Sequence, residues 1–360
     1  MVGEILFHLG FAKAGSTAVQ RAFAAGAVRC PSLSLDYPEP SRHIPFANSL
    51  RRNHPAAAKR TGRSRRMARS LKQSDADLGL VSAEAFENVP PSALREFLDR
   101  RLPEAEGRVR LIAYLRPHVE RTVSAFAERT KKGEVDWSLA AHHDKTLGSG
   151  AALAFRRLTK WRDAFGDAFE VRPMIRERLR EGSVVHDFAH WAFRGAPYEV
   201  GDLPAQNESL SLRDLAVMAE IHREIARHHS GTAQAQVALG WNMQPVLASL
   251  TEAAPVRVAA DRALVARMQE DFAEDAARVD EAFMEGTPMQ DALAAAAGRA
   301  VDVPQSLDPE AHLSPGELRT VRAAARFLGR MMETDPAGFS RLARGLAADP
   351  VAEQLAEAAE

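Results

Sequence analysis

Short apolar runs alternate with stretches of helical spacing over the first part of the chain. The apolar runs read as strands and cover residues 5–9, 78–81, 108–115 and 169–174. Helical spacing starts at Ser16, covers 91–101, resumes at Val119 and covers 151–165. Strands that alternate with helices predict a parallel sheet with right-handed crossovers.

Beyond residue 209 the strand pattern fades and helical patterns take over. Two long ones fill residues 210–229 and 261–284. A linker marked by prolines follows, with Pro304, Pro309 and Pro315. We therefore predict one domain over 1–300 and a helical C-terminal extension over 301–360.

The bulk composition narrows the class of protein. The net charge is −1, so no global field draws the chain to nucleic acid or to membranes. Cys30 is the single cysteine, which excludes an internal disulfide and a cysteine-rich zinc site. Glu4 interrupts the first apolar run, unlike a signal peptide, and no run reaches the roughly 18 apolar residues of a membrane span. We expect a soluble cytoplasmic protein.

One segment, residues 40–74, is strongly basic. It has no Asp or Glu and ten basic residues, namely Arg42, Arg51, Arg52, Lys59, Arg60, Arg63, Arg65, Arg66, Arg69 and Lys72. Pro45 and Pro55 break it, so we expect helical pieces and a mobile loop. It either binds an acidic acceptor, such as an anionic glycan, or is a solvated basic loop. Phe46 is the single Phe, Trp or Tyr within residues 40–74. So few aromatic side chains do not favour binding of single-stranded nucleic acid by base stacking.

The turn after the first strand, FAKAGSTAVQ at residues 11–20, carries the groups that a phosphate needs. Backbone N–H groups at a helix N-terminus bind anions, helped by the helix dipole. Gly15 allows close approach, Lys13 adds a charge, and Ser16 and Thr17 add hydroxyl donors. The alternative is an ordinary turn before a helix with Ser16 as its N-cap.

The turn is not a Walker A loop. That motif places its lysine directly after the second glycine and a Ser or Thr after the lysine. Here Lys13 comes two residues before Gly15, and Ala14 follows the lysine. The pattern therefore argues against an ordinary ATPase or GTPase.

The order Lys-x-Gly-Ser-Thr at residues 13–17, directly after a first strand, resembles the 5′-phosphosulfate loop of sulfotransferases. These enzymes use 3′-phosphoadenosine 5′-phosphosulfate (PAPS), and HLGFAKAGSTAVQ is most similar to the bacterial carbohydrate-type members. Their usual form has threonine where this chain has Ala14. The resemblance implies that the 5′-phosphate is held by Lys13, Ala14, Gly15, Ser16 and Thr17.

A second stretch, LIAYLRPHVERTVSAF, strengthens this resemblance. The family binds the 3′-phosphate with an arginine at the end of a later strand and a serine eight residues on, which implies these roles for Arg116 and Ser124. The guanidinium fork suits phosphate, although a surface arginine beside a proline is the plain alternative. Weaker similarity continues, so the resemblance covers roughly residues 1–286.

Sulfuryl transfer to a hydroxyl needs a general base. Glu84 is the first candidate, because it follows the second predicted strand at the carboxyl edge of the sheet and related sulfotransferases use glutamate. His43 is the rival, since other members of the superfamily use histidine. Both also have ordinary interpretations, Glu84 as a residue of a first helical turn and His43 as a loop histidine.

Together these features predict an α/β domain with a P-loop-NTPase-like parallel sheet flanked by helices. The predicted function is PAPS-dependent sulfotransfer to an acceptor hydroxyl, most simply that of a carbohydrate, with no metal and no nucleic acid involved. Two alternatives stay open, a nucleotide-dependent kinase of P-loop type and a catalytically silent glycan- or nucleotide-binding protein. The residues favour no particular acceptor and no particular oligomeric state.

Overall fold

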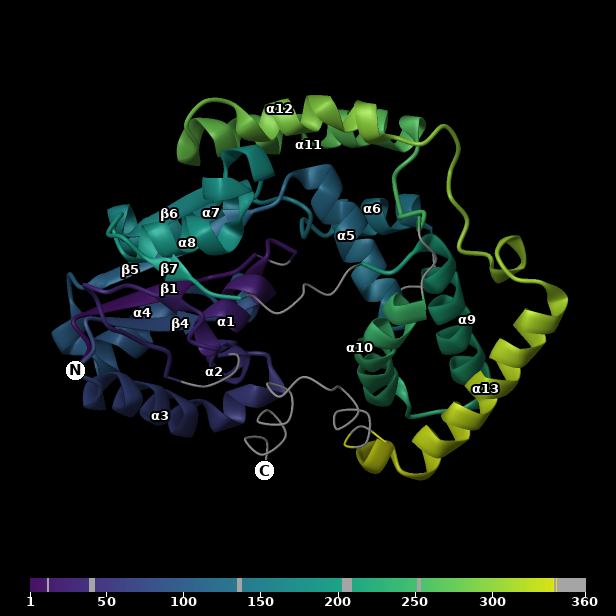
Figure 1. The fold of residues 1–360 in the computed structure, drawn as a ribbon, viewed down its shortest axis with the longest axis horizontal. Helices are drawn as coiled ribbons and strands as arrows, with labels where there is room; N and C mark the ends of the chain where they lie inside the picture. Colours follow the sequence, from purple (N-terminus) through teal and green to yellow (C-terminus); the bar gives the residue numbers. More distant parts are fainter. Residues whose placement is uncertain are drawn as a thin grey trace. The chain divides into compact units, whose positions relative to one another are not determined.

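The structure is a computed structural model that describes residues 1–11, 13–38, 43–134, 138–202, 209–250, 254–339 and 341. Its contacts divide the chain into two compact units (Figure 1). The first comprises Met1–Arg121, Leu153–Ala205 and Phe272–Leu293, and the second comprises Thr122–Ala152, Gln206–Asp271 and Ala294–Glu360. The helical second unit thus draws on three segments, while the boundary predicted at residue 300 stays a prediction.

The first unit is built on a five-stranded sheet in which every neighbouring pair is parallel. The strands, in spatial order, are β3 (Leu35–Asp36), β4 (Leu78–Ser82), β1 (Glu4–His8), β5 (Val109–Leu115) and β6 (Phe169–Pro173). β1 lies at the centre, and Ile5 to His8 are all buried, as expected for a strand covered on both faces. The predicted α/β class, with a parallel sheet flanked by helices, is confirmed.

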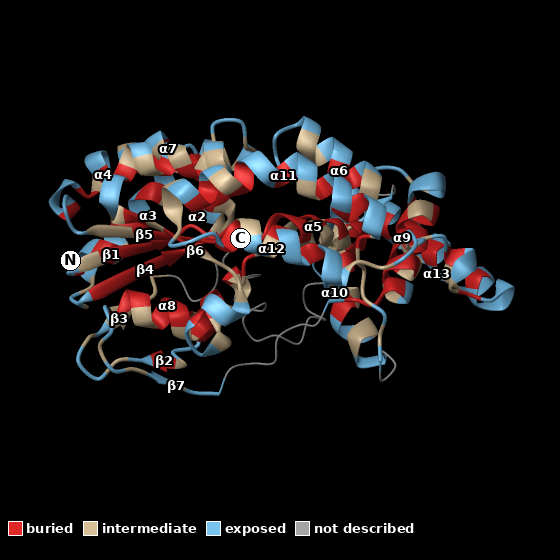
Figure 2. Cartoon of the chain, turned by 90° about the horizontal axis from the view of Figure 1, so that it is seen from above, coloured by how far each residue is buried: buried red, intermediate tan, exposed pale blue. Residues whose placement is uncertain are grey.

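Helices cover both faces of this sheet. Those of the first unit are α1 (Ser16–Ala24), α2 (Ile44–Leu50), α3 (Arg60–Gln73), α4 (Pro91–Arg101), α7 (Phe155–Phe165), α8 (Val184–Ala192) and most of α12 (Pro288–Ala295). α1 packs against α8, whereas α3, α4 and α7 form the layer on the other face (Figure 2). The central strands β4 and β1 and most of β5 are coloured as buried, so these strands and the apolar faces of the helices form the core.

Three helices of the described chain span a boundary between the units, namely α5 (His118–Lys131), α11 (Arg262–Phe283) and, in its last two residues, α12. The second unit also contains α6 (Leu139–Gly148), α9 (Leu212–His228), α10 (Ala233–Leu250) and α13 (Pro315–Thr334). Met218 and Ile225 of α9 share a core with Ala325 and Met332 of α13. The predicted C-terminal helix is therefore confirmed and packs closely on α9. None of the helices within the described ranges is long and apolar enough to cross a membrane.

The basic segment contains the expected helical pieces. Its described part, from His43, forms α2, a 3₁₀ helix (η1, Pro55–Lys59) and α3, and residues 51–54 form a non-helical connection between α2 and η1. Pro45 and Pro55 each lie in the first turn of a helical piece, where a missing N–H costs little, so Pro55 follows the break between α2 and η1. Residues 40–42 lie outside the described residues.

Three smaller differences complete the fold. The helix expected over 151–165 begins only at Phe155. Neither the edge strand β3 nor the antiparallel pair of β2 (Val28–Arg29) and β7 (Glu199–Val200) was expected. Each of these strands has two residues, too few to show a period in the sequence.

Candidate functional site

The turn between β1 and α1 is shaped by two glycines in left-handed conformations. Gly10 has φ 39° and Gly15 has φ 77°. A Cβ on Gly10 would lie 2.5 Å from Ser16 Oγ and 2.9 Å from the Glu84 Cα, and one on Gly15 would lie 2.9 Å from the Met174 Cε. The turn therefore requires glycine at both positions and brings the segment after β4 directly against it.

Ser16 is the first residue of α1, and Gly15 is its N-cap, so the alternative in which Ser16 caps the helix is wrong. The Ser16 side chain is only 4% exposed, and its Oγ has no hydrogen-bond partner. The first N–H groups of a helix also lack partners within it and lie at the positive end of its dipole. A buried hydroxyl beside such a helix end fits a phosphate oxygen.

The two sequence motifs for phosphate meet at this turn. Arg116 directly follows β5, and its Nη1 donates to the Lys13 carbonyl oxygen at 3.3 Å. Since β5 is parallel to β1, both residues lie at the carboxyl edge of the sheet, where open α/β sheets bind ligands. Lys13 itself has φ 68°, a conformation that is costly outside glycine and typical of functional turns.

Three further members of the predicted phosphate set are placed by the fold. Ala14 is fully buried, and its N–H donates to the Phe11 carbonyl at 3.1 Å, which closes the turn. Thr17 is half-buried in the first turn of α1. Ser124 lies on α5, in the part that belongs to the second unit. The roles of these residues in binding stay predictions.

Glu84 opens a 3₁₀ helix, η2 (Glu84–Asn88), directly after β4. The Ala83 N–H donates to the His8 carbonyl at 3.2 Å, which ties the end of β4 to the end of β1. Glu84 is half-buried, and its backbone lies against Gly10 of the turn. The first candidate for the base thus stands beside the candidate phosphate loop.

His43, the rival base, is fully buried under the ring of Tyr37, with ring centroids 4.5 Å apart. Its Nδ1 accepts the Ser82 N–H at 2.8 Å, so the neutral ring carries its proton on Nε2. Burial lowers the pKa of His43 to about 3, which keeps the ring neutral. Neither nitrogen then offers a lone pair to an acceptor hydroxyl.

His8, at the end of β1, is a second buried histidine that contacts Ser82. Its Nδ1 lies 2.8 Å from Ser82 Oγ, and burial lowers its pKa to about 3. The ring packs at 5.2 Å from that of Phe188. We interpret His8 as a residue that joins the strand ends and packs the core beneath the turn.

The structure also places a charged cluster at this edge that sequence reasoning missed. Glu87, on η2, accepts from Arg121 Nη2 at 2.5 Å and from Arg157 Nη1 at 2.8 Å. The Arg157 guanidinium carbon lies 5.5 Å from the ring centroid of Phe11, the residue that begins the turn. These residues are far apart in sequence and no local motif joins them, although Arg121 stands in the same stretch as Arg116.

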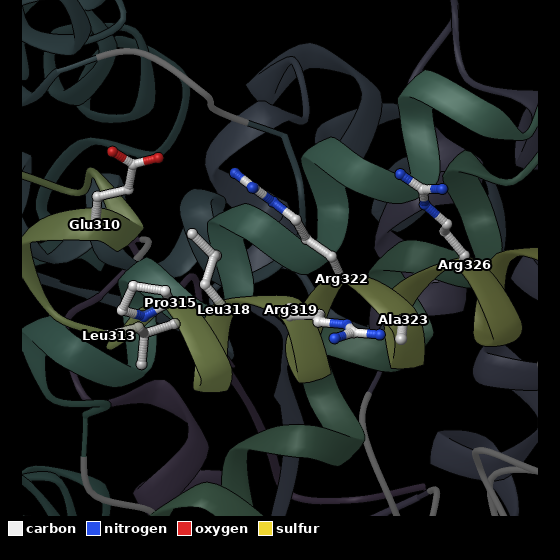
Figure 3. A pocket seen from close by; sticks show the side chains of 8 residues that line it. All are labelled: Glu310, Leu313, Pro315, Leu318, Arg319, Arg322, Ala323 and Arg326. Atoms are coloured by element: carbon white, nitrogen blue, oxygen red, sulfur yellow. The ribbon is translucent and has the colours of Figure 1, made fainter.

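A pocket of about 700 Å³ lies elsewhere, in the second unit (Figure 3). It is lined by Glu310, Leu313, Pro315, Leu318, Arg319, Arg322, Ala323 and Arg326. Arg322 and Arg326 each donate at 2.6 Å to a buried glutamate of α9, Glu220 and Glu224 respectively. These arginines thus fasten α13 to α9, and we assign the pocket no chemistry. Within the described ranges, no three His, Cys, Asp or Glu side chains gather as a metal site would need.

The comparisons with known proteins add little to this geometry. No family model matches the chain, and no curated protein matches it. Among solved structures, one described as a sulfotransferase from Alicyclobacillus acidocaldarius resembles it, with a TM-score of 0.42 and 12% identity over 79% of this chain and 98% of that one. A likeness of this degree carries no argument about function, so the functional interpretation depends on the residues of the turn.

Proposed function

We propose that the chain is a sulfotransferase that moves the sulfuryl group of PAPS to an acceptor hydroxyl, most simply of a carbohydrate. The observation that carries the proposal is the contact between Arg116 and Lys13, at 3.3 Å. It unites two stretches, each of which resembles a phosphate-binding motif of the PAPS-dependent family. Both stretches stand at the same edge of the sheet, as one nucleotide with two phosphate groups would require.

The turn supplies the groups that act on the donor. In this proposal Lys13, the N-terminus of α1 and the Ser16 and Thr17 hydroxyls bind the 5′-phosphate, which gains negative charge as its bond to sulfur breaks. Stabilising that charge lowers the barrier, because it is largest in the transition state. Arg116 binds the 3′-phosphate in this proposal, since its guanidinium fork suits phosphate oxygens.

Glu84 is the base in this proposal. It accepts the proton of the acceptor hydroxyl while that oxygen bonds to sulfur and the bond from sulfur to the phosphate oxygen breaks. The products are the sulfated acceptor and adenosine 3′,5′-bisphosphate. His43 is the weaker candidate, because its Nδ1 is occupied by the Ser82 N–H and its Nε2 carries the proton.

The acceptor itself is proposed to be an anionic molecule. α3 turns Met67 and Leu71 into the core and leaves Arg65, Arg66 and Arg69 exposed. Other basic groups of the segment are already engaged: Arg60 pairs with Glu96, Lys72 pairs with Glu104, and Arg63 donates to the Pro45 carbonyl. The three exposed arginines offer a basic surface that an acidic glycan would favour.

Nucleotide discrimination tests the donor site. Adenosine 3′,5′-bisphosphate is expected to bind more tightly than AMP by isothermal titration calorimetry, because Arg116 addresses the 3′-phosphate. Arg116→Ala should remove most of this preference, whereas Arg95→Ala, which removes a cation held at the Ala164 carbonyl, should keep it. Equal affinity of the wild type for both nucleotides would contradict the proposal, and magnesium-dependent ATP turnover would favour a kinase instead.

A further inference from the structure

Arg157 lies near the start of α7, which a carboxylate holds by two hydrogen bonds. The Asp275 carboxylate accepts the N–H groups of Ala154 and Phe155, at 2.8 and 3.0 Å, and so fixes the helix end on which Arg157 stands. Phe155 begins the helix, so Arg157 belongs to its first turn. From there its guanidinium reaches the ring of Phe11 at the phosphate turn, 5.5 Å away.

Two arginines meet at the Glu87 carboxylate. Glu87 is 9% exposed and receives both Arg121 and Arg157, so two guanidinium groups share one carboxylate. Burial, and next the charge of Arg121, lower the pKa of Arg157, while the carboxylates of Glu87 and Asp275 act in the opposite direction. A second anion next to Arg157 would be electrostatically favourable.

The donors of Arg157 point to the kind of anion. Nη1 is occupied by Glu87, while Nε and Nη2 are buried and have no hydrogen-bond partner among the described residues. These two N–H groups are parallel and form one fork, which matches two oxygens of a carboxylate or a sulfate. Leaving charged donors buried and unpaired is costly, so a site of this kind indicates a ligand.

The fork lies close to the proposed chemistry. Side chains three residues apart on a 3₁₀ helix lie on the same side, and Glu84 and Glu87 are related in this way on η2. The arginines that Glu87 holds therefore stand on the side of the proposed base. Phe11 links the same guanidinium to the phosphate turn.

We propose that Arg157 forms an oxyanion subsite between the phosphate turn and Glu84, and that Glu87 holds its fork in position. The inference rests on the proposed function and extends it by naming a binding residue and a ligand class. The anion is either the sulfuryl group in transfer or an acid group of the acceptor. Both present the same pair of oxygens to the fork.

Inorganic sulfate is the probe for this subsite. It is titrated by calorimetry into protein saturated with adenosine 3′,5′-bisphosphate, which fills both phosphate sites. Arg157→Lys keeps the charge but loses the fork, and we expect sulfate to bind at least tenfold more weakly. Arg162→Lys is the matched control, because Arg162 lies on the same helix, donates to the Ala282 carbonyl and packs on Phe283. It should bind sulfate like the wild type.

The outcomes separate two failures. If adenosine 3′,5′-bisphosphate does not bind the wild type, the proposed function fails. If it binds but sulfate affinity is unchanged in Arg157→Lys, the subsite is wrong and the cluster is an ion-pair support for α7. Should the variant not fold, phenylglyoxal labelling of the wild type decides: sulfate should protect Arg157, and equal labelling with and without sulfate would overturn the inference.

Steady-state kinetics then distinguish the two sources of the anion. A similar loss of kcat with neutral and acidic acceptors in Arg157→Lys would assign the fork to the sulfuryl group. A raised KM confined to acidic acceptors would assign it to the acceptor. Unchanged kinetics with both acceptor types would contradict the subsite as a whole.

Discussion

Replacing Ser16 with alanine should move stability and nucleotide affinity in opposite directions. The Ser16 Oγ is buried without a hydrogen-bond partner, and a buried unsatisfied polar group costs about 1–3 kcal/mol. Alanine removes that cost and leaves a small gap where the oxygen was. We expect the free energy of unfolding of the nucleotide-free protein to rise by about 1 kcal/mol.

The same change should weaken binding of adenosine 3′,5′-bisphosphate. A hydrogen bond to a charged group contributes about 1.5–3 kcal/mol, so losing the one between Ser16 and the 5′-phosphate should raise Kd about ten- to hundredfold. Urea unfolding without nucleotide gives the stability, and calorimetric titration gives the affinity. The two measurements together test whether the hydroxyl is placed for a ligand or for the fold.

Ser49 provides the matched control. Its side chain is also buried, but its Oγ donates to the Phe46 carbonyl at 2.6 Å. Ser49→Ala should therefore lose about 1 kcal/mol of stability and keep the nucleotide affinity. If Ser16→Ala behaves like this control, with lower stability and unchanged Kd, the hydroxyl is structural and the phosphate assignment of the turn is refuted.

Two further predictions concern the base and pH. Glu84→Gln should remove most sulfotransferase turnover and keep the nucleotide affinity. The control Glu96→Gln, at a half-exposed glutamate of α4, should keep both turnover and affinity. Full turnover in Glu84→Gln would contradict the assignment of Glu84 as the base. Burial lowers the pKa of His142 to about 4, and neither ring nitrogen has a hydrogen-bond partner in the described structure. Its folded-state pKa lies below the unfolded value of about 6.5, so its contribution to stability is complete above pH 6.5 and declines as the pH falls toward 4, by up to about 1.4 kcal/mol per pH unit. His142→Leu should flatten the dependence of urea unfolding on pH, and an unchanged slope would refute this.

Much of the fold follows from local pattern. The strands β1, β4, β5 and β6 are recognisable because each is a short apolar run, and β1 and β4 are buried along nearly their whole length. The helices α1, α4 and most of α7 follow from their apolar spacing. The division of the helical region into three segments could not be predicted, because it depends on packing between distant helices such as α9 and α13.

Some residues of the candidate site could likewise be predicted from the sequence, and others could not. The turn at Lys13 and the arginine after β5 carry local motifs, and parallel strands bring their carboxyl ends to one edge, so their meeting could be anticipated. Glu87 and Arg157 carry no motif and meet only through tertiary packing. The buried Ser16 hydroxyl without a hydrogen-bond partner could not be predicted either, because the sequence pattern is also compatible with a serine N-cap.

The most direct measurement is mass spectrometry of acceptors incubated with the full chain and PAPS. A panel of neutral and acidic saccharides tests the substrate class, and adenosine 3′,5′-bisphosphate is quantified in the same reaction. We predict an acceptor that gains one sulfuryl group, with one adenosine 3′,5′-bisphosphate released for each sulfate transferred, and loss of both products in Lys13→Ala. Tight binding of adenosine 3′,5′-bisphosphate with no sulfation of any acceptor and no release of nucleotide from PAPS would contradict sulfotransfer and identify a silent nucleotide-binding protein.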